Sequence, residues 1–343
     1  MRLIEVGIPP RPAGRDGEAF PLQDVAQPNL LPEVFPPSQA PRIAFDGRSV
    51  PKAPPMDVWI VDASFRNGQA PLAPDQALLL YGLLHRLGGP RGVIRQTEFP
   101  LATEADRETV RLCKGTGHPF PEPTAWIRSA REEIGLVKAA GLKEAGFPTP
   151  VSDFRIFQEQ KQTRKAALRT YLEGVDAALD AGILPRCHLE DVTRADLHGF
   201  VVPFAIALMK RARQAEIPVK VRLCDTLGYG VTHEGAALPR SVQKLVHALT
   251  EDAAVPAEWL EWQGQNGLFK ALPNAGTAWL YGAGAACGSL MGLGEGGGNA
   301  AIEGLIFEYL GLKGEANGLN PAVLAEIVAF YRLLPQGALA ITA

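Results

Sequence analysis

Two glutamines separated by one residue, Gln263 and Gln265 in the stretch EWQGQNGLFK, are the feature of this 343-residue sequence with the clearest chemical meaning. Side chains at positions i and i+2 of a β-strand point to the same face. Two histidines at this spacing would therefore indicate a pair of metal ligands aimed into one site. Two glutamines place neutral amides there instead, which leaves open a metal enzyme without its metal, a different enzyme, or a protein without catalysis.

Polar side chains follow nearly every apolar, strand-like run of the chain. In RCHLED, Arg186, His188 and Glu190 alternate, so all three can point to one side of a strand. Asp and Asn are also common helix N-caps, so a single residue of this kind is as well explained by a solvated cap. As a set they favour a functional site, and its members are Asp62, Arg66, Asn67, Arg95, Glu98, Arg128, Ser152, Asp153, Arg186, His188, Glu190, Asp225, Thr226, Gln263, Gln265, Asn266 and Asn299.

The scaffold that must position these residues is indicated by a regular alternation from residue 57 onward. Strand-like runs lie at 57–62, 92–99, 124–128, 141–147, 185–191, 219–225, 258–262 and 286–293, and helical patterns between them include 74–88, 129–140, 165–182 and 241–252. Eight such units predict an α/β fold, a closed TIM (β/α)₈ barrel. In that fold the site lies at the carboxyl ends of the strands.

Flanking segments complete the predicted organisation. Residues 1–55 hold 12 of the 29 prolines, which excludes long helices and central strands. We expect an extended Pro-rich arm there, with a short hairpin turning at Asp46-Gly47. The barrel is assigned to residues 56–315, and residues 316–343 to a tail with a helix at 320–334. Residues 271–294 carry no charge, but their six glycines favour a small-residue helix and a buried strand over a membrane span.

Composition narrows the partners and the compartment. A formal charge of −3 gives no reason to expect a nucleic acid or an anionic membrane as a partner. The four cysteines show no CxxC spacing, which indicates neither a disulfide framework nor a thiolate zinc site. The N-terminus, MRLIEVGIPPRP, has no apolar core of signal-peptide length. We therefore expect a cytoplasmic protein.

Several motifs resemble a known superfamily. WIVDASFRNGQ resembles the signature Asp-x-Thr-x-Arg-Asp-Gly-x-Gln of the isopropylmalate synthase, homocitrate synthase and hydroxymethylglutaryl-CoA lyase enzymes. RCHLEDVTRADLHGFVVPF and VRLCDTLGYGV resemble the Re-type citrate synthases more closely, and the likeness runs from QPNLLPEVFP to about residue 330. The resemblance implies a metal-dependent Claisen condensation, in which a deprotonated acyl-CoA attacks the ketone of a 2-oxo acid held on a divalent cation.

The resemblance also implies a set of metal ligands, from which this sequence departs. The family uses the Asp after the signature Arg, a His-x-His on the seventh strand and an Asn after the eighth. Here Asn67, Gln263 and Gln265 replace the first three, and only Asn299 stands. The family's Asp after Asn266 is a glycine, and the turn GEGGGN lacks the usual Arg. The synthases continue into a subdomain with a catalytic His, and nothing in this chain matches it.

These departures change the expected chemistry. Three amides offer carbonyl oxygens without formal charge, so we expect no tightly bound divalent metal and no resident cofactor. Their N–H₂ groups are expected to hold a carboxylate or carbonyl oxygen directly. Carried over by the resemblance, the catalytic residues are Arg66, Glu98, His188, Glu190 and Thr226, and the substrate-binding residues are Asn67, Gln69, Arg128, Asp225, Gln263, Gln265, Asn266 and Asn299.

Two function classes remain open. One is an enzyme that forms carbon–carbon bonds without a metal, acting on a 2-oxo acid or other small carboxylate with an acyl-CoA as candidate co-substrate. Arg66 would orient the anion, and His188 or Glu190 would move a proton. The other is an inactive homologue that binds a metabolite or completes an active synthase. Either class is expected to form a homodimer or a heteromer with a homologous synthase.

A dinucleotide site is a further alternative, because Gly292 to Gly297 satisfy GxGxxG. Such a site needs an acid at the end of a second strand about 20 residues on. That region, LIFEYLGLKGEANG, is typical of a helix and turn. The pattern therefore favours an anion-facing loop after the eighth strand.

Overall fold

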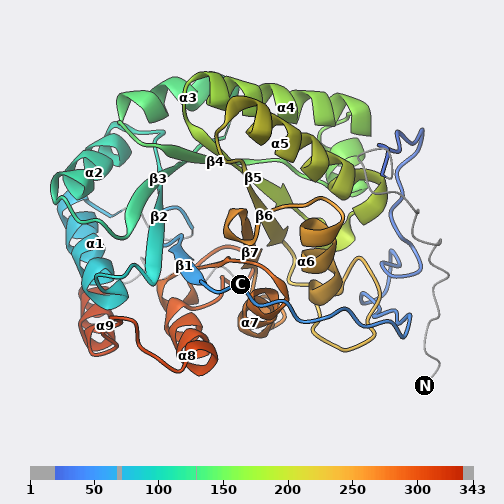
Figure 1. Cartoon of the computed structure of the whole chain (residues 1–343). Helices are drawn as coiled ribbons and strands as arrows, with labels where there is room; N and C mark the ends of the chain where they lie inside the picture. Colours follow the sequence, from blue (N-terminus) through green and yellow to red (C-terminus); the bar gives the residue numbers. More distant parts are fainter. Residues whose placement is uncertain (1–19, 68–71, 129, 335–343) are drawn as a thin grey trace.

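The computed structural model describes residues 20–67, 72–128 and 130–334. Within them, eight parallel strands pair in sequence order, and the first also pairs with the last to close a barrel (Figure 1). The strands are β1 (Trp59–Asp62), β2 (Ile94–Pro100), β3 (Glu122–Trp126), β4 (Glu144–Pro148), β5 (Leu184–Glu190), β6 (Lys220–Asp225), β7 (Leu260–Gly264) and β8 (Ala285–Gly288). The predicted TIM barrel is confirmed.

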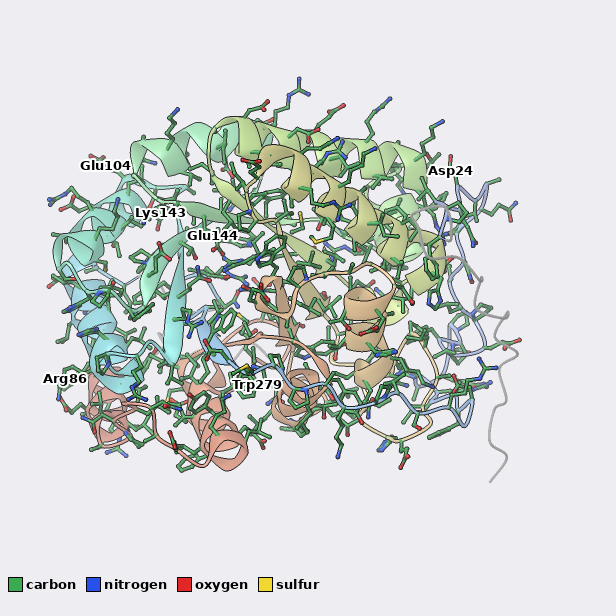
Figure 2. All side chains as sticks on the ribbon, viewed as in Figure 1. Asp24, Arg86, Glu104, Lys143, Glu144 and Trp279 are labelled. Atoms are coloured by element: carbon green, nitrogen blue, oxygen red, sulfur yellow. The ribbon has the colours of Figure 1, made fainter. Side chains whose placement is uncertain are left out.

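Helices form a ring around the strands (Figure 1). Their starts follow local sequence rules: Pro74 opens the first helix, and Thr103 and Ser241 each accept a backbone N–H at a helix N-cap. In Figure 2, Arg86 and Glu104 lie on the outside of this ring. The helices are α1 (Pro74–Gly88), α2 (Glu104–Gly115), α3 (Ala130–Ala139), α4 (Arg164–Asp180), α5 (Val202–Ala215), α6 (Val242–Glu251), α7 (Ala271–Tyr281), α8 (Ile302–Lys313) and α9 (Val323–Leu333).

Alternation along the strands separates two environments. On β5, Cys187 and Leu189 belong to the apolar layer between strands and helices. Arg186 and His188 point instead into the barrel, where both are buried. The small-residue helix and buried strand expected in 271–294 are α7 and β8, and no helix among the described residues is long and apolar enough to cross a membrane.

The barrel interior is filled by charged side chains, which we call the ion network: Arg66, Glu98, Glu144, Arg186, Lys220, Arg222 and Glu261. Arg186 lies 2.6 Å from both Glu98 and Glu144, and Arg222 lies 2.6 Å from Glu98. Figure 2 shows Glu144 within the helical ring. Buried charges require this kind of pairing, because an isolated ion in the interior is strongly disfavoured.

Two local predictions need correction. The eighth strand ends at Gly288 rather than 293, because a short 3₁₀ turn follows it and Met291 adopts a φ of 57°. The hairpin expected at Asp46-Gly47 is replaced by pairing with the body. Phe45 forms an antiparallel bridge with Ala236, and the Asp46 carboxylate receives a hydrogen bond from Lys244 at 2.5 Å. The Asp-Gly turn sequence is present, but the segment before it pairs with the β6–α6 loop instead of a second hairpin strand.

Candidate functional site

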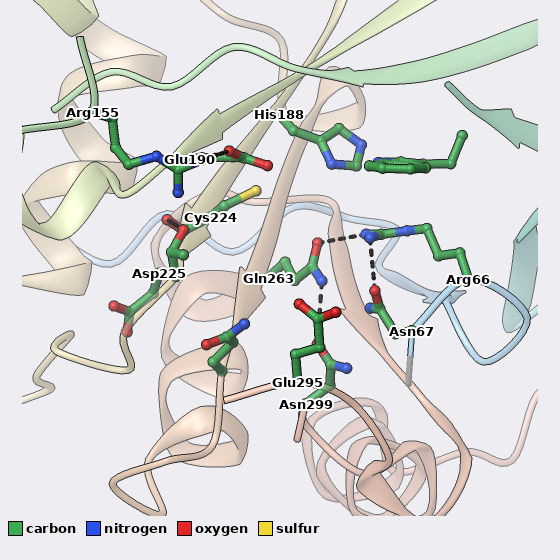
Figure 3. Close-up of a pocket in the computed structure, with 13 residues that line it drawn as sticks. Arg66, Asn67, Arg155, His188, Glu190, Cys224, Asp225, Gln263, Glu295 and Asn299 are labelled. Carbon is green, nitrogen blue, oxygen red and sulfur yellow. Dashed lines mark hydrogen bonds and ion pairs between the residues drawn. The ribbon is translucent and has the colours of Figure 1, made fainter. Parts of the chain in front are cut away.

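A cavity of about 350 Å³ opens at the carboxyl ends of the strands (Figure 3). Nine of the predicted site residues line it, which places the polar strand ends around one space as the barrel topology requires. The lining residues are Arg66, Asn67, Trp126, Arg155, His188, Glu190, Cys224, Asp225, Thr226, Gln263, Gln265, Glu295 and Asn299.

Arg66 connects the amides of this cavity. Its Nη1 donates to Oδ1 of Asn67 at 2.9 Å, and its Nη2 donates to Oε1 of Gln263 at 2.9 Å. The Gln263 amide then donates to Oδ1 of Asn299 at 3.2 Å. Figure 3 shows this chain from Arg66 to Asn299. The guanidinium therefore occupies the place toward which the side chains at positions 67 and 263 point.

Glu98 binds Arg66 from inside the barrel. The carboxylate pairs with Nε of Arg66, and it also receives Arg186 and Arg222 at 2.6 Å each. Burial alone would raise the pKa of Glu98, but these arginines hold it well below its usual range. Glu98 is thus an ionised anchor. It does not itself line the cavity in the described structure.

His188 and Glu190 differ in their fitness for proton transfer. Burial, together with Arg222, lowers the pKa of His188 well below its ordinary value, so the imidazole is neutral. Glu190 is half-buried, and burial raises its pKa while Arg155, 3.1 Å away, opposes the rise. Glu190 is therefore the candidate general base of the pair, because it lines the cavity and its raised pKa lies closer to neutral pH than that of an ordinary Glu.

Two further predicted residues organise loops at the rim. The Asp225 carboxylate accepts bonds from Thr193 Oγ1 and from the backbone N–H groups of Tyr229 and Gly230, all at 2.8 Å. Thr226 accepts the backbone N–H of Asp191 at 2.8 Å. Both line the cavity, but most of their hydrogen-bonding capacity is used within the protein.

Three of the residues assigned by the resemblance lie elsewhere or cannot be placed. Five others of the strand-end set do not line the cavity either: Asp62, Arg95, Ser152, Asp153 and Arg186. Asn266 accepts the backbone N–H of Ala271 at 3.2 Å, at the start of α7, and is not among the cavity residues. Arg128 lies two residues beyond the end of β3 at Trp126 and lines a neighbouring cavity. Gln69 lies outside the described residues.

Sequence reasoning missed four lining residues: Trp126, Arg155, Cys224 and Glu295. Trp126 is the last residue of β3, a position that the strand-end argument could have found. Arg155 lies on a π-helix, Phe154–Glu159, whose irregular geometry leaves no clear periodic signal in the sequence. Cys224 is neutral, since burial raises the pKa of its thiol.

The glycine-rich turn after β8 packs directly against the loop after β7. Gly296 has a φ of 61°, and a Cβ added there would lie 2.2 Å from Oε1 of Gln265. A Cβ on Gly267 would lie 2.9 Å from the Gly296 carbonyl oxygen. The backbone at Gly296 therefore lies against the Gln265 side chain, and the backbone at Gly267 lies against the Gly296 carbonyl. The chain then enters α8, so this part of the described structure lacks the second strand of a dinucleotide fold.

The donor set does not suit the divalent metal that the superfamily implies. All four ligand positions carry neutral amides, and Gln263 and Asn67 direct their carbonyl oxygens to the Arg66 guanidinium. Among the described residues, no cluster of three His, Cys, Asp or Glu side chains is arranged to hold a metal ion. A cation here would meet a positive charge and few charged donors.

Comparison with known proteins identifies the family to which this chain belongs. The model of the HMGL-like family matches residues 62–330. The chain belongs to the HMGL-like family. It is 53% identical over 316 residues to the citrate (Re)-synthase of Syntrophus aciditrophicus, covering 91% of this chain and 50% of that protein. It is 42% identical to the citrate (Re)-synthase of Clostridium kluyveri, covering 91% of this chain and 70% of that protein.

More distant relatives and solved structures agree with the fold. The chain is 33% identical to the 2-phosphinomethylmalate synthase of Streptomyces hygroscopicus, covering 92% of this chain and 73% of that protein. The HMG-CoA lyase of Bacillus subtilis superposes with a TM-score of 0.62 at 20% identity, covering 82% and 94% of the two chains. This HMGL-like chain is thus similar to condensation-type synthases. It spans half the length of the Syntrophus relative.

Proposed function

We propose that this HMGL-like barrel forms a carbon–carbon bond between an acyl-CoA and a 2-oxo acid, and that it does so without a resident divalent metal. The proposal is supported by its similarity to synthases with condensation products in their names. It is also supported by a polar cavity at the strand ends, where this fold places its chemistry.

The position of Arg66 is the main support for condensation without a metal. Its guanidinium donates to the residues at two of the family's ligand positions, Asn67 and Gln263. Of its five N–H groups, those used by Glu98, Asn67 and Gln263 leave one on each Nη without an acceptor among the described residues. A ketone or carboxylate oxygen in the cavity would accept them, and the developing alkoxide would strengthen those bonds.

The proton transfers and bond changes of the condensation can be assigned to groups in the cavity. Glu190, as base, takes a proton from the carbon beside the thioester carbonyl. That carbon bonds to the ketone carbon, and the ketone π-electrons move onto the oxygen held by Arg66. The alkoxide then takes up a proton, and water cleaves the thioester to release CoA. Neutral His188, whose pKa is lowered by burial, would bind substrate through its ring nitrogens rather than act as the base.

The test is a condensation assay in EDTA. Acetyl-CoA and a panel of 2-oxo acids are incubated with the protein, thiol release is followed, and products are identified by mass spectrometry. We expect a condensed hydroxy acid from at least one pair with the wild-type protein, and its loss in Arg66→Gln. Absence of product from every pair, or product that requires added Mn²⁺ or Mg²⁺, would contradict the proposal.

A second candidate is supported by the same amides. Gln263 is bonded to both Arg66 and Asn299, so much of its capacity is spent on side chains of the site. A protein that only binds a carboxylate, alone or as a partner of a homologous synthase, would need no more than this. Ligand binding without condensation in the assay above, with or without metal, would favour this candidate.

A further inference from the structure

A separate cavity lies outside the barrel, between the N-terminal arm and helices α6 and α7. In the arm, Ala44 accepts a backbone hydrogen bond from the β6–α6 loop at 2.8 Å, and Ala53 donates one to the last turn of α7 at 3.1 Å. Between these contacts, residues 48–50 and Lys52 border a cavity of about 330 Å³, here called the arm cavity. Figure 1 shows the arm passing α6 and α7 before it reaches β1. Among the described residues, none lines both the arm cavity and the cavity at the strand ends.

Two cationic side chains of the arm are available to a ligand in the arm cavity. Arg48 and Lys52 both line it, and both residues are exposed. Within the described part of the chain, neither side chain has a hydrogen-bond acceptor or an ion-pair partner. The Arg48 guanidinium and the Lys52 ammonium therefore keep their donors for an anion.

A third cation, Lys244 of α6, is fixed in the wall of the arm cavity. It is 8% exposed, and its Nζ donates to the Asp46 carboxylate at 2.5 Å and to the Ala236 carbonyl oxygen at 2.6 Å. An ammonium has three donors, so one remains for a ligand. Because two bonds already hold this group in place, a ligand would not have to order it on binding.

The acidic groups of this region do not cancel its positive charge. The lining includes three cationic side chains and one carboxylate, that of Glu234. Asp46 is occupied by Lys244 and by the backbone N–H of Arg48 at 2.9 Å. With Asp46 counted against Lys244, two cations face one carboxylate, so the arm cavity keeps a net positive charge. It also borders the first turn of α6, where the helix dipole favours an anion.

A phosphate group suits this arrangement, because its oxygens can accept bonds from donors on different segments, and Arg and Lys are common phosphate partners. Ser49 and Tyr281 add hydroxyl groups to the lining. The volume of about 330 Å³ lies at the lower end of the range of about 300–1,000 Å³ for small-molecule sites. This volume favours a small organic phosphate over the bare ion.

We propose that the arm cavity binds a small phosphate monoester, with Arg48 and Lys52 as its main anchors. Lys244 would contribute its remaining donor from the opposite wall, so the bound phosphate would join the arm to α6. This binding site lies outside the proposed condensation chemistry and does not depend on it.

Calorimetric titration of the full chain with glycerol 3-phosphate, inorganic phosphate and glycerol tests this. We expect glycerol 3-phosphate to bind more tightly than inorganic phosphate, and glycerol not to bind. Arg48→Gln and Lys52→Gln should each weaken glycerol 3-phosphate binding about tenfold or more, the loss for hydrogen bonds to charged groups. Both positions are exposed, so these variants should fold like the wild type. Arg42→Gln is the matched control and should leave the affinity unchanged, because Arg42 is exposed on the same arm but bonds to Gln39 outside the arm cavity.

The outcomes separate the arm cavity from the cavity at the strand ends, and a phosphate ester from free phosphate. Binding that is lost in Arg66→Gln and kept in Arg48→Gln would place the phosphate at the strand ends and overturn the inference. So would a wild-type protein that binds neither anion at millimolar concentration, or an affinity that neither Arg48→Gln nor Lys52→Gln lowers. Equal affinity for the two anions, lost in Arg48→Gln, would support the phosphate site and identify free phosphate as its ligand.

Discussion

Replacing Glu98 by Gln should strongly destabilise the barrel, because three arginines converge on this buried carboxylate. Arg186 and Arg222 lie 2.6 Å from it, and Arg66 pairs with its other oxygen. Two unit charges about 4 Å apart attract by about 4 kcal/mol at an effective dielectric constant of about 20. Desolvation offsets part of this, and loss of one partner from a buried pair typically costs about 3–5 kcal/mol. We expect Glu98→Gln to lower the free energy of unfolding by that amount.

Urea unfolding followed by tryptophan fluorescence measures the loss, with Glu326→Gln as control. Glu326 pairs with Arg86 on the surface, where both side chains are half exposed, and its removal should change little. Since the pKa of Glu98 is held well below its usual value, its contribution is present above the unfolded-state pKa and disappears as pH falls through the folded-state pKa. The difference between Glu98→Gln and the wild type should therefore shrink in acid. A loss below about 1 kcal/mol at neutral pH, the range of surface pairs, would refute the reasoning.

Three further predictions concern the cavity. Arg66→Ala should remove about 1.5–3 kcal/mol from the binding of a 2-oxo acid, measured calorimetrically, because bonds to charged groups have this strength; unchanged affinity would place the site elsewhere. Condensation activity should rise as pH increases through the raised pKa of Glu190, because the base must be ionised. Product formation measured across a pH series should lose this rise in Glu190→Gln. The combined change Asn67→Asp, Gln263→His and Gln265→His should introduce divalent-metal binding, detected by elemental analysis. The same variant should bind a 2-oxo acid more weakly in EDTA, since the new carboxylate competes for Arg66. Unaltered anion binding would mean that these amides contact nothing important.

Sequence patterns were sufficient for the barrel because its rules are local. Proline at position 74 and the apolar spacing after it place α1 at Pro74–Gly88, which is the predicted range. The polar residues at the strand ends follow from the same logic, since parallel strands in a barrel finish at one face. Arg66, His188 and Gln263 line one cavity, as this rule predicts.

The ion network was harder to predict because its partners are distant along the chain. Arg222 lies within VKVRLC, which is typical of a buried strand, and its partners Glu98 and Glu261 are on β2 and β7. No local pattern indicates that these charges compensate one another inside the barrel. Arg155 escaped for a different reason, because the π-helix that carries it has no distinctive periodicity.

The direct test of the central claim, that Arg66 rather than a metal holds the ligand, is calorimetric titration of the wild-type protein with 2-oxoglutarate in EDTA and again with Mn²⁺. The Arg66 guanidinium is fixed by Glu98, Asn67 and Gln263 whether or not a metal is added. We therefore predict the same affinity and stoichiometry in both titrations. Binding that disappears in EDTA and returns with one equivalent of Mn²⁺ would contradict the account.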